Sequence, residues 1–396
     1  MEITTGVVLA AGEGTRMRPL TANRPNTMLP AAGRPILDHV LDALVDNGID
    51  SIHLVVGYRR ERVQEHLGHS YRGVPLTYVP QEKQLGSGHA LGRAKGSIEG
   101  PTLVLNGDRV VDGSIVEDVL EGFDGGPALA VLEHPQPTRY GAVRVDGDRL
   151  AELVEKPDGG DFRLINAGVY AFGPSVFDAI DRTPSRSGEL RVPDVLGTMM
   201  DEGAVRATRT DGLWADATYP WDLLALTREL LADGRVSEPE SEPGSGIRVA
   251  ESARIHADAT LQGPVVIGAD TEVGAGAVLG PNVAVGRNVT IGANATLRDA
   301  VVDGDCRIDA GVTALETVLG ESVSVGAGTV IPGGPGDVRV GDTVYEGQAL
   351  GAVLADRTSV GGGVTLTPGT LVGANVEIGA GVHAGGTIAD GTEVVR

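Results

Sequence analysis

The chain has 396 residues, which is too long for one ordinary domain and predicts two or three. Its 54 acidic and 32 basic residues give a net charge of −22, which disfavours nucleic-acid and anionic-membrane partners. No apolar run reaches the roughly 18–20 residues of a membrane span, and the first residues lack the basic region of a signal peptide. One cysteine excludes a disulfide framework, so we expect a cytoplasmic protein.

The charge pattern has a second interpretation. Lysine occurs only at positions 83, 95 and 156, and the other basic residues are arginine. The acidic residues are spread over both halves of the chain. Such a surface suits solubility in concentrated salt, which predicts a halophilic source. An acidic protein from a source at ordinary salt remains the alternative.

Strand-like and helical segments alternate in the first part of the chain. Strands are predicted at 6–10, 51–56, 76–79 and 102–105, and helices at 36–45, 60–67 and 90–95. This alternation predicts an α/β domain whose mostly parallel sheet is covered by helices on both faces. Ligands of such sheets bind at the carboxyl ends of the strands, where the segments 9–12 and 105–108 lie.

A glycine-containing turn follows the first strand. Gly12 and Gly14 let the backbone approach a phosphate chain, and Arg16 supplies a fixed positive charge for phosphate oxygens. A dinucleotide-binding fold would need a third glycine and an acidic residue after the second strand. That strand ends at Gly57 and Tyr58, so the dinucleotide interpretation is disfavoured.

Composition changes near residue 234. Residues 234–247 are polar and rich in Pro, Gly and Ser, which predicts a linker between domains at 1–233 and 248–396. Aliphatic residues then recur every six positions, without a miss, at 249, 255, 261, 267, 273, 279, 285, 291 and 297. This period predicts a parallel β-helix in which the aliphatic side chains point inward and stack coil on coil.

The hexapeptide pattern is interrupted twice. Its register is lost near Asp303 and resumes at Leu319 and again at Leu354. Residues 332–351 break the coil and are predicted to form a loop thrown out of the β-helix. Cys306 is expected to be a small buried residue.

The segment 9–30, LAAGEGTRMRPLTANRPNTMLP, resembles the signature of sugar-1-phosphate nucleotidyltransferases. Further segments that resemble this family follow in the family's order, at 81–90, 106–108, 140–141, 155–157, 166–168 and 214–222. In these enzymes a sugar phosphate attacks the α-phosphate of a nucleoside triphosphate, pyrophosphate leaves and a nucleotide sugar forms. The resemblance implies a Rossmann-like nucleotidyltransferase domain and a β-helix that is usually left-handed and often trimeric, hence a homo-oligomer.

The resemblance also implies roles for individual residues. Asp108 and Asp216 would hold Mg²⁺, Arg16 would neutralise the triphosphate and Lys156 would approach the sugar phosphate. The nucleotide-binding residues would be Leu9, Ala11, Gly12, Gly14, Thr15, Arg16, Gln81, Gly86 and Ser87. The sugar-binding residues would be Tyr140, Gly141, Glu155, Asn166 and Gly168. His89 is expected only to pack or to cap a helix.

One residue departs from the family pattern. The family usually has Pro-Lys where this chain has Pro25 and Asn26, and that lysine normally touches the phosphates. Arg18 or Arg24 could compensate for the lost charge. Two hypotheses therefore stay open: an enzyme that uses UTP or dTTP, or a catalytically weakened regulatory subunit that binds nucleotide sugars.

The two-part layout resembles the bifunctional N-acetylglucosamine-1-phosphate uridyltransferases, whose β-helix also transfers an acetyl group from acetyl-CoA. That family has a His and a Tyr just before the coil at 317–330, an Asn just after it and a Lys beyond. Here 310–316 contains neither His nor Tyr, 331–334 contains no Asn, and no lysine follows Lys156. Acetyl transfer is therefore disfavoured, and the β-helix is expected to form a trimer or to bind an allosteric ligand.

Overall fold

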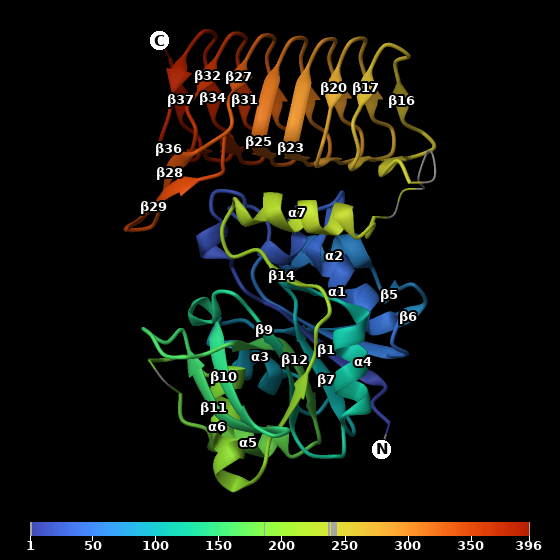
Figure 1. Cartoon of the computed structure of the whole chain (residues 1–396), viewed down its shortest axis with the longest axis vertical. Helices are drawn as coiled ribbons and strands as arrows, with labels where there is room; N and C mark the ends of the chain where they lie inside the picture. Colours follow the sequence, from blue (N-terminus) through green and yellow to red (C-terminus); the bar gives the residue numbers. More distant parts are fainter. Residues whose placement is uncertain (1, 186, 237, 239–243, 396) are drawn as a thin grey trace. The chain divides into compact units, whose positions relative to one another are not determined.

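The structure, a computed structural model, separates into two compact units (Figure 1). It describes residues 2–185, 187–236, 238 and 244–395. The first unit comprises Met1–Glu13 and Ile36–Ala215, and the second comprises Gly14–Pro35 and Asp216–Arg396.

The division into units differs from the division that composition suggests. Gly14–Pro35 and the helix that precedes the predicted linker group with the β-helix. The boundaries at 233 and 248 remain a prediction about folding domains. The middle of the predicted linker, at 237 and 239–243, lies outside the described residues.

The first unit is built on a ten-stranded sheet with the order β10-β11-β13-β9-β12-β7-β1-β4-β6-β5. These strands are β1 (Thr5–Ala10), β4 (Ser51–Val56), β5 (Ser70–Tyr71), β6 (Val74–Pro80), β7 (Thr102–Asn106), β9 (Ala128–Glu133), β10 (Gly141–Asp146), β11 (Arg149–Glu155), β12 (Leu164–Phe172) and β13 (Arg206–Arg209). The four strands β7, β1, β4 and β6 are parallel, as predicted. Beyond β7 the sheet is mixed, because β12 runs antiparallel to both β7 and β9.

Helices cover both faces of this sheet. They are α1 (Ile36–Val45), α2 (Arg60–Leu67), α3 (Ser87–Arg93), α4 (Gly113–Glu121), α5 (Val176–Arg182) and α6 (Val192–Glu202). Contacts join α3, α5 and α6 in one group and α1 and α4 in another. The neighbouring β1 residues Val7 and Val8 point to opposite faces, and both are fully buried. The expected α/β fold is therefore confirmed.

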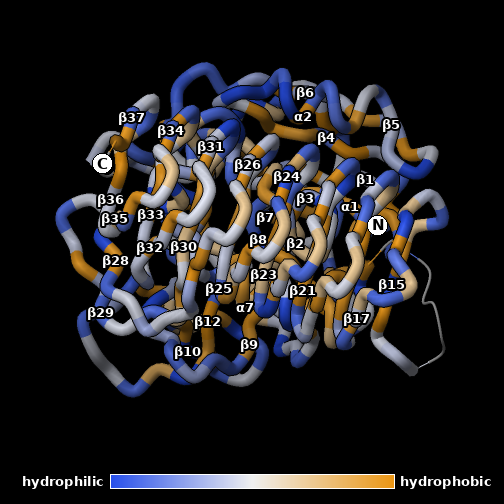
Figure 2. Tube along the Cα trace, turned by 90° about the horizontal axis from the view of Figure 1, so that it is seen from above, coloured by the Kyte–Doolittle hydropathy of each residue, from blue (hydrophilic) through white to orange (hydrophobic). Residues whose placement is uncertain are grey.

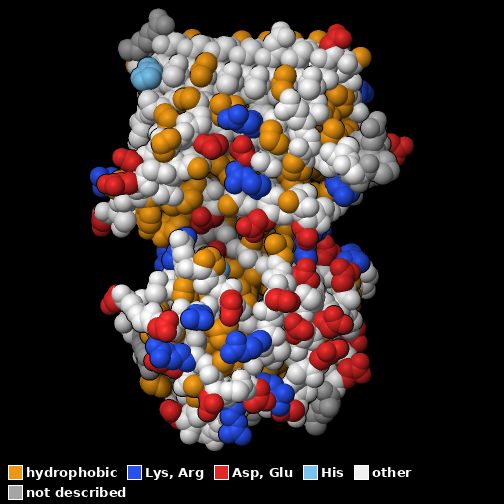
Figure 3. All heavy atoms as spheres, viewed as in Figure 1, with side chains coloured by type: hydrophobic (Ala, Val, Ile, Leu, Met, Phe, Trp, Pro, Cys, Tyr) orange, Lys and Arg blue, Asp and Glu red, His pale blue; other side chains and the backbone are white. Residues whose placement is uncertain are grey.

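Short connecting elements complete the first part of the chain. They are the turns η1 (Thr15–Met17), η2 (Asn26–Met28) and η3 (Pro137–Arg139) and the strands β2 (Pro30–Ala31), β3 (Arg34–Pro35), β8 (Arg109–Val111) and β14 (Trp214–Asp216). No helix in the described part of the chain is both long and apolar enough to cross a membrane. Acidic side chains are numerous on the face of the first unit drawn in Figure 3.

In the second unit, strands stack coil on coil into a parallel β-helix with three faces. One face holds β15 (Ile247–Val249), β18 (Val265–Ile267), β21 (Val283–Val285), β30 (Ala352–Leu354), β33 (Thr370–Val372) and β36 (Thr387–Ile388). The next holds β16 (Arg254–Ile255), β19 (Glu272–Val273), β22 (Thr290–Ile291), β24 (Arg307–Ile308), β26 (Ser324–Val325), β31 (Ser359–Val360), β34 (Glu377–Ile378) and β37 (Glu393–Val394). The last holds β17 (Thr260–Leu261), β20 (Val278–Leu279), β27 (Val330–Ile331), β32 (Thr365–Leu366) and β35 (His383–Ala384).

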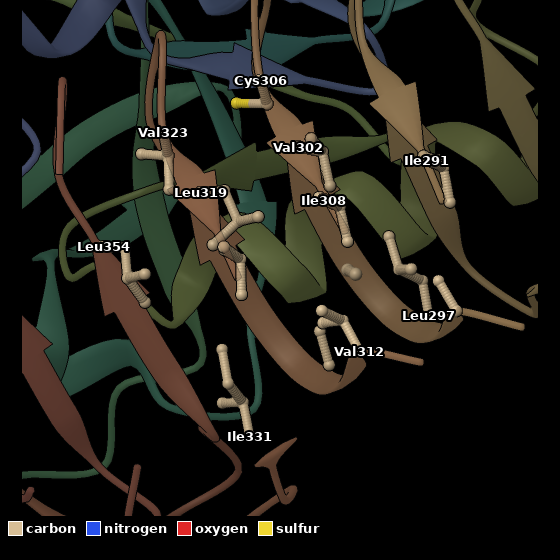
Figure 4. Close-up of a cluster of buried hydrophobic side chains, with 14 of the residues drawn as sticks. Ile291, Leu297, Val302, Cys306, Ile308, Val312, Leu319, Val323, Ile331 and Leu354 are labelled. Carbon is tan, nitrogen blue, oxygen red and sulfur yellow. The ribbon is translucent and has the colours of Figure 1, made fainter. Parts of the chain in front are cut away.

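The predicted inward positions form the core of the β-helix. Hydrophobic residues recur along successive coils (Figure 2), and their side chains pack in one continuous cluster (Figure 4). Six of the nine residues at the predicted hexad positions belong to this cluster, and Val249, Ile255 and Leu261 of the first coil pack against it. Cys306 is buried in the same cluster, as expected.

A change in coil length explains why the hexapeptide register is lost near Asp303. Val265 pairs with Val283, but Val285 pairs with Val302 and Val302 pairs with Leu319, so these coils are one residue shorter. The shortened corner lets β23 (Thr296–Val302) and β25 (Thr313–Leu319) run across two faces of the helix. Periodicity is therefore displaced by one position at each of these two corners, and the coil continues without interruption there.

Two further elements belong to the second unit. The segment predicted as a thrown-out loop forms a hairpin of β28 (Gly336–Val340) and β29 (Thr343–Gln348), after which the coil resumes with β30. Helix α7 (Asp222–Ala232) contacts β23, β25 and β2. The hydroxyl of Thr227 on α7 accepts a hydrogen bond from the N–H of Ala32 at 3.4 Å, which ties 14–35 to this helix.

Candidate active site

The carboxyl ends of the parallel strands bring several predicted residues to one edge of the first unit's sheet. Leu9 pairs with Asn106, and the N–H of Gly107 donates to the carbonyl of Leu9 at 3.0 Å. Gly57 follows β4, and a Cβ at this position would lie 2.8 Å from the carbonyl oxygen of Ala11. The turn after β1 therefore packs closely on its neighbours.

Gln81 follows β6 at the same edge, and its amide is held in one orientation. The side chain is only 3% exposed, and its Nε2 donates to the carbonyl of Gly86 at 3.2 Å. Because a carbonyl can only accept, Nε2 must face Gly86, and Oε1 is turned the other way. Nε2 also lies 2.8 Å from Nδ1 of His89.

His89 does more than pack against its neighbours or cap a helix, because its ring contacts the Gln81 amide. Burial lowers the pKa of its imidazole, and the charge of Arg93 lowers it further. The ring is therefore neutral at pH 7, and its Nδ1 accepts the hydrogen bond from Gln81. His89 thus fixes the orientation of Gln81, which sequence reasoning missed.

The loop from Gly86 into α3 is held by the segment before α6. The φ of Gly86 is 97°, and a Cβ there would lie 2.3 Å from the carbonyl oxygen of Leu190. The N–H of Gly88 donates to that carbonyl at 2.8 Å. The Ser87 hydroxyl accepts a hydrogen bond from the N–H of Val192 at 3.0 Å. Contacts of Gly86 and Ser87 with a nucleotide remain a prediction.

The predicted sugar-side residues are brought together by β10, β11 and β12. Gly141 pairs with Glu155, and a Cβ on Gly141 would lie 3.3 Å from the Glu155 carboxylate. The N–H of Lys156 donates to the carbonyl of Tyr140 at 2.9 Å. Glu155 and Lys156 are both exposed.

Asn166 lies at an irregularity of β12. Its Oδ1 accepts from the N–H of Gly168 at 2.9 Å, and its Nδ2 donates to the hydroxyl of Tyr170 at 2.9 Å. A Cβ on Gly168 would lie 2.6 Å from Nδ2 of Asn106, the residue that ends β7. Gly168 therefore links the sugar-side group to the turn that carries Asp108.

An aromatic cluster surrounds Tyr140. The rings of His134 and Trp214 lie 4.8 Å and 5.0 Å from it, both edge to face. The Trp214 indole donates to the carbonyl of Ala167 at 2.8 Å, and the Arg109 guanidinium lies 5.5 Å from its ring centroid. Sequence analysis placed Trp214 in the family-like segment 214–222 without a role of its own, and it missed His134 and Arg109. The signal available in the sequence was that aromatic residues are rare, at 3% of the chain, so each of them deserves a role.

The two predicted metal ligands belong to different units, and each is described in its own. Asp108 is half-buried in the turn after β7. Asp216 accepts a hydrogen bond from the hydroxyl of Thr218 at 2.7 Å. The carboxylate of Asp222 accepts from the N–H groups of Thr218 and Tyr219, which closes the turn after Asp216. Among the described residues no group of three or more His, Cys, Asp or Glu side chains is placed to hold a metal.

The rest of the signature segment belongs to the second unit. Gly14 has a φ of 61°, and a Cβ there would lie 2.6 Å from Cβ of Asn26. The hydroxyl of Thr21 donates to the carbonyl of Gly14 at 2.8 Å. Thr15 and Arg16 follow on η1 and are exposed, whereas Asn26 is buried at 8% exposure.

Arg24 is paired with carboxylates in the second unit. Its guanidinium is buried, with Nη1 lying 2.5 Å from Asp303 and Nη2 contacting Asp356. Both carboxylates come from the β-helix. Arg18 is exposed and remains the other candidate.

This arrangement defines an α/β nucleotide-binding protein with an appended parallel β-helix. Residues 5–232 match the family model described as nucleotidyl transferase, and 261–349 match the model described as GMPPB C-terminal domain. The chain belongs to the nucleotidyl transferase family. The predicted resemblance and the prediction of a nucleotidyltransferase are both confirmed.

Several relatives share much of this chain. "Bifunctional protein GlmU" of Methanococcus maripaludis is 34% identical over 390 residues, which cover 94% of this chain and 93% of the relative. "UTP--glucose-1-phosphate uridylyltransferase AglF" of Haloferax volcanii is 36% identical over 223 residues, covering 54% and 92%. A solved UDP-glucose pyrophosphorylase, complexed with UDP-glucose, has a TM-score of 0.53 at 21% identity over 58% of this chain and 99% of its own, and supports the fold alone.

Proposed function

We propose that this chain transfers a nucleotidyl group from UTP or dTTP to a sugar-1-phosphate. An oxygen of the sugar phosphate attacks the α-phosphorus, and a new P–O bond forms there. The bond from the α-phosphorus to its bridging oxygen breaks, and pyrophosphate leaves with that electron pair. The names of the relatives support this reaction, because they include a UTP--glucose-1-phosphate uridylyltransferase.

The orientation of the Gln81 amide supports a preference for certain nucleotide bases. Its Nε2 faces Gly86 and His89, which leaves Oε1 to accept a hydrogen bond. Uracil and thymine offer a donor at N3, whereas N3 of cytosine is an acceptor. We therefore expect UTP or dTTP to bind in preference to CTP.

The residues present suit Mg²⁺. Two carboxylates without a third acidic, Cys or His ligand match an ion that keeps several waters and binds phosphate oxygens. Asp108 and Asp216 would hold it, and when bound it would neutralise charge on the transferring phosphoryl group. Arg16 would bind the triphosphate, and Lys156 would bind the sugar phosphate.

The remaining roles follow the predicted sets. Leu9, Ala11, Gly12, Gly14, Thr15, Gly86 and Ser87 would contact the nucleotide, and Tyr140, Gly141, Glu155, Asn166 and Gly168 would contact the sugar. The acceptor would be glucose-1-phosphate or N-acetylglucosamine-1-phosphate. A trimer formed by the β-helix, a cytoplasmic location and a halophilic source belong to the same proposal.

Pyrophosphate release in high salt with Mg²⁺ tests the proposal. UTP, dTTP, ATP, GTP and CTP are each combined with several sugar-1-phosphates. Turnover with UTP or dTTP, and not with CTP, is expected. Gln81→Ala should raise KM for the nucleotide about 10-fold or more, because it removes a base contact, and leave KM for the sugar phosphate unchanged. Gln64→Ala, at an exposed position of α2, is the matched control.

Asn26 supports a second candidate function, a weakened regulatory subunit that binds nucleotide sugars. Asn26 carries no charge, and the neighbouring Arg24 is already paired with two carboxylates. Restoring the lysine with Asn26→Lys separates the two functions. A large gain in rate would favour the weakened subunit, whereas an unchanged rate would remove its main support.

Acetyl transfer by the β-helix is still disfavoured, because residues 310–316 contain no His or Tyr and residues 331–334 contain no Asn. The word "bifunctional" in the name of a relative describes that relative. Release of CoA from acetyl-CoA in the presence of glucosamine-1-phosphate is the direct test. A signal that depends on the sugar phosphate would contradict the expectation.

A further inference from the structure

The β-helix and the signature segment Gly14–Pro35 belong to the same unit, and a buried ionic cluster joins them. Arg24 contributes the guanidinium, and Asp303 and Asp356 contribute the carboxylates. These partners lie 279 and 332 residues further along the chain. A contact of this kind is not needed to form either local structure.

The carboxylates come from one corner of three successive coils. Val302, Leu319 and Leu354 stack on one another, and Asp303, Gly320 and Ala355 follow them directly. A Cβ on Gly320 would lie 2.6 Å from Oδ1 of Asp356, so the missing side chain makes room for this carboxylate.

Asp303 departs from the repeat at this corner. The residues in register with it in the other coils are all small: glycine at 268, 286, 320 and 373, and alanine at 250, 355 and 389. A small residue would therefore serve the coil at this place, and an aspartate needs another explanation. Its contact with Arg24 at 2.5 Å supplies one.

The cluster is buried and is held in place by further hydrogen bonds. Arg24 is 7% exposed and Asp356 is 1% exposed. Oδ1 of Asp356 also accepts from the N–H of Glu321 at 3.0 Å, and Oδ1 of Asp303 accepts from the N–H of Gly304 at 2.7 Å. Buried charges with several fixed partners hold a geometry more firmly than an exposed pair does.

Arg24 is close in sequence and in contacts to the turn proposed to bind phosphate. Asn26 follows two residues later, and its Cβ lies against Gly14. The hydroxyl of Thr21 closes the same turn by donating to the carbonyl of Gly14. A shift of Arg24 would therefore move the turn that precedes Arg16.

We propose that Arg24 is a positioning residue for nucleotidyl transfer, and that the β-helix holds the signature segment in place through Asp303 and Asp356. The inference rests on the proposed function. It gives the β-helix a part in that reaction without any chemistry of its own. Sub-ångström placement matters in such reactions, because a misplacement of about 1 Å can lower the rate about 10²-fold.

The test compares Arg24→Met with Arg228→Met in the full-length chain. Arg228 on α7 forms an exposed ion pair with Asp299 of the β-helix at 2.8 Å, so it is a matched link outside the signature segment. We expect Arg24→Met to lower kcat/KM for the nucleotide about 10²-fold and to leave KM for the sugar phosphate unchanged. Arg228→Met should stay within about twofold of wild type. Equal effects of the two variants would overturn the proposal.

A triple variant separates positioning from stability. Arg24→Met combined with Asp303→Asn and Asp356→Asn removes every charge of the cluster, so the melting temperature should recover relative to Arg24→Met alone. Activity should stay low, because the ionic contact between the segment and the β-helix is then lost. A triple variant with wild-type kcat/KM would show that the charges serve folding only, and would overturn the proposal. Arg24→Lys, which keeps the charge, should recover part of the activity.

A binding measurement keeps this inference apart from the proposed reaction. UTP affinity is measured by calorimetry for wild type, Arg24→Met and Arg228→Met. If wild type binds UTP but releases no pyrophosphate with any acceptor, the proposed reaction fails. The inference then still predicts weaker UTP binding in Arg24→Met alone, and unchanged binding in that variant would overturn it.

Discussion

The two units hold their candidate site residues in different ways. In the first unit, Gln81, Asn166 and Gly168 are fixed by hydrogen bonds and close approaches to residues on neighbouring strands and loops. In the second unit, the corresponding segments are held by local hydrogen bonds and also contact side chains of the β-helix. The first arrangement follows from the sheet itself, whereas the second depends on coils that lie far away in the sequence.

The hairpin of the β-helix gives a second example of this dependence. Tyr345 on β29 lies 4.7 Å from the ring of Tyr219 and 5.4 Å from that of Trp221, and the two tyrosine hydroxyls are 2.6 Å apart. Tyr219 and Trp221 stack on each other just after Asp216. The appended domain therefore braces both segments of the second unit that carry proposed catalytic or metal-binding residues.

The largest expected effect tests whether a carboxylate from each unit contributes equally to kcat. Asp108→Asn in the first unit and Asp216→Asn in the second should each lower kcat about 10³-fold, because each removes a proposed ligand of the charge-neutralising ion. The double variant should be little worse than either single one, since residues that act as a unit are not additive. Steady-state pyrophosphate release measures all three.

Asp211→Asn, at an exposed position, is the control for these variants. A wild-type rate in Asp108→Asn or in Asp216→Asn would remove that residue from the proposed site.

The next effect concerns the first unit alone. Gly86→Ala places a Cβ 2.3 Å from the carbonyl oxygen of Leu190 at a φ of 97°, so the loop must shift. We expect KM for the nucleotide to rise about 10²-fold, with KM for the sugar phosphate unchanged. Gly96→Ala is the control, because its φ of 88° is similar but nothing lies within 4 Å of the added Cβ. Similar KM values in both variants would show that the contact with Leu190 is unimportant.

The sequence predicted the features that repeat or that lie close together in the chain. The hexapeptide aliphatic residues, the parallel strands and the turns at 9–12 and 105–108 are all in place. The coils shortened by one residue hid the register near Asp303, because a single missing corner residue shifts every later inward position.

Long-range pairings could not be predicted in the same way. Arg24 can pair with any of 54 acidic residues, and periodicity alone does not select Asp303 and Asp356. An aspartate in place of a small corner residue was a visible signal at Asp303. The contact of His89 with Gln81 needs the turn between them to be built, so its role emerged only from the structure.

A smaller effect tests the brace from the hairpin. Tyr345→Ala removes the ring against Trp221 and the hydroxyl contact with Tyr219, and should lower kcat about 10-fold through the turn after Asp216. Tyr345→Phe keeps the ring and should lose about twofold. Val344→Ala, at an exposed neighbouring position, is the control. An unchanged kcat in Tyr345→Ala would mean that the turn is held without the β-helix.

The smallest effect is a difference in pH dependence between the units. In the first unit, the hydrogen bond to Asp38 raises the pKa of His66 above its ordinary value of 6.5, against the opposing effect of burial. A raised pKa in the folded state gives stability that is fully present below about pH 6.5 and is lost as the pH rises through the raised value. In the second unit, burial alone would lower the pKa of Arg24. The charges and hydrogen bonds of Asp303 and Asp356 outweigh burial and raise this pKa, so Arg24 stays charged over the whole pH range of the experiment.

Thermal unfolding at pH 5.5 and pH 8.5 measures the pH dependence of the first unit. Asp38→Asn should destabilise the protein by about 0.5 kcal/mol at pH 5.5 and by less at pH 8.5, because the partly exposed pair is charged only at the lower pH. Arg72→Gln breaks the pair of Arg72 with Asp42, which lies 2.9 Å away on α1, and should cost the same at both pH values. An Asp38→Asn deficit that is equal at both pH values would mean that His66 does not titrate as the structure requires.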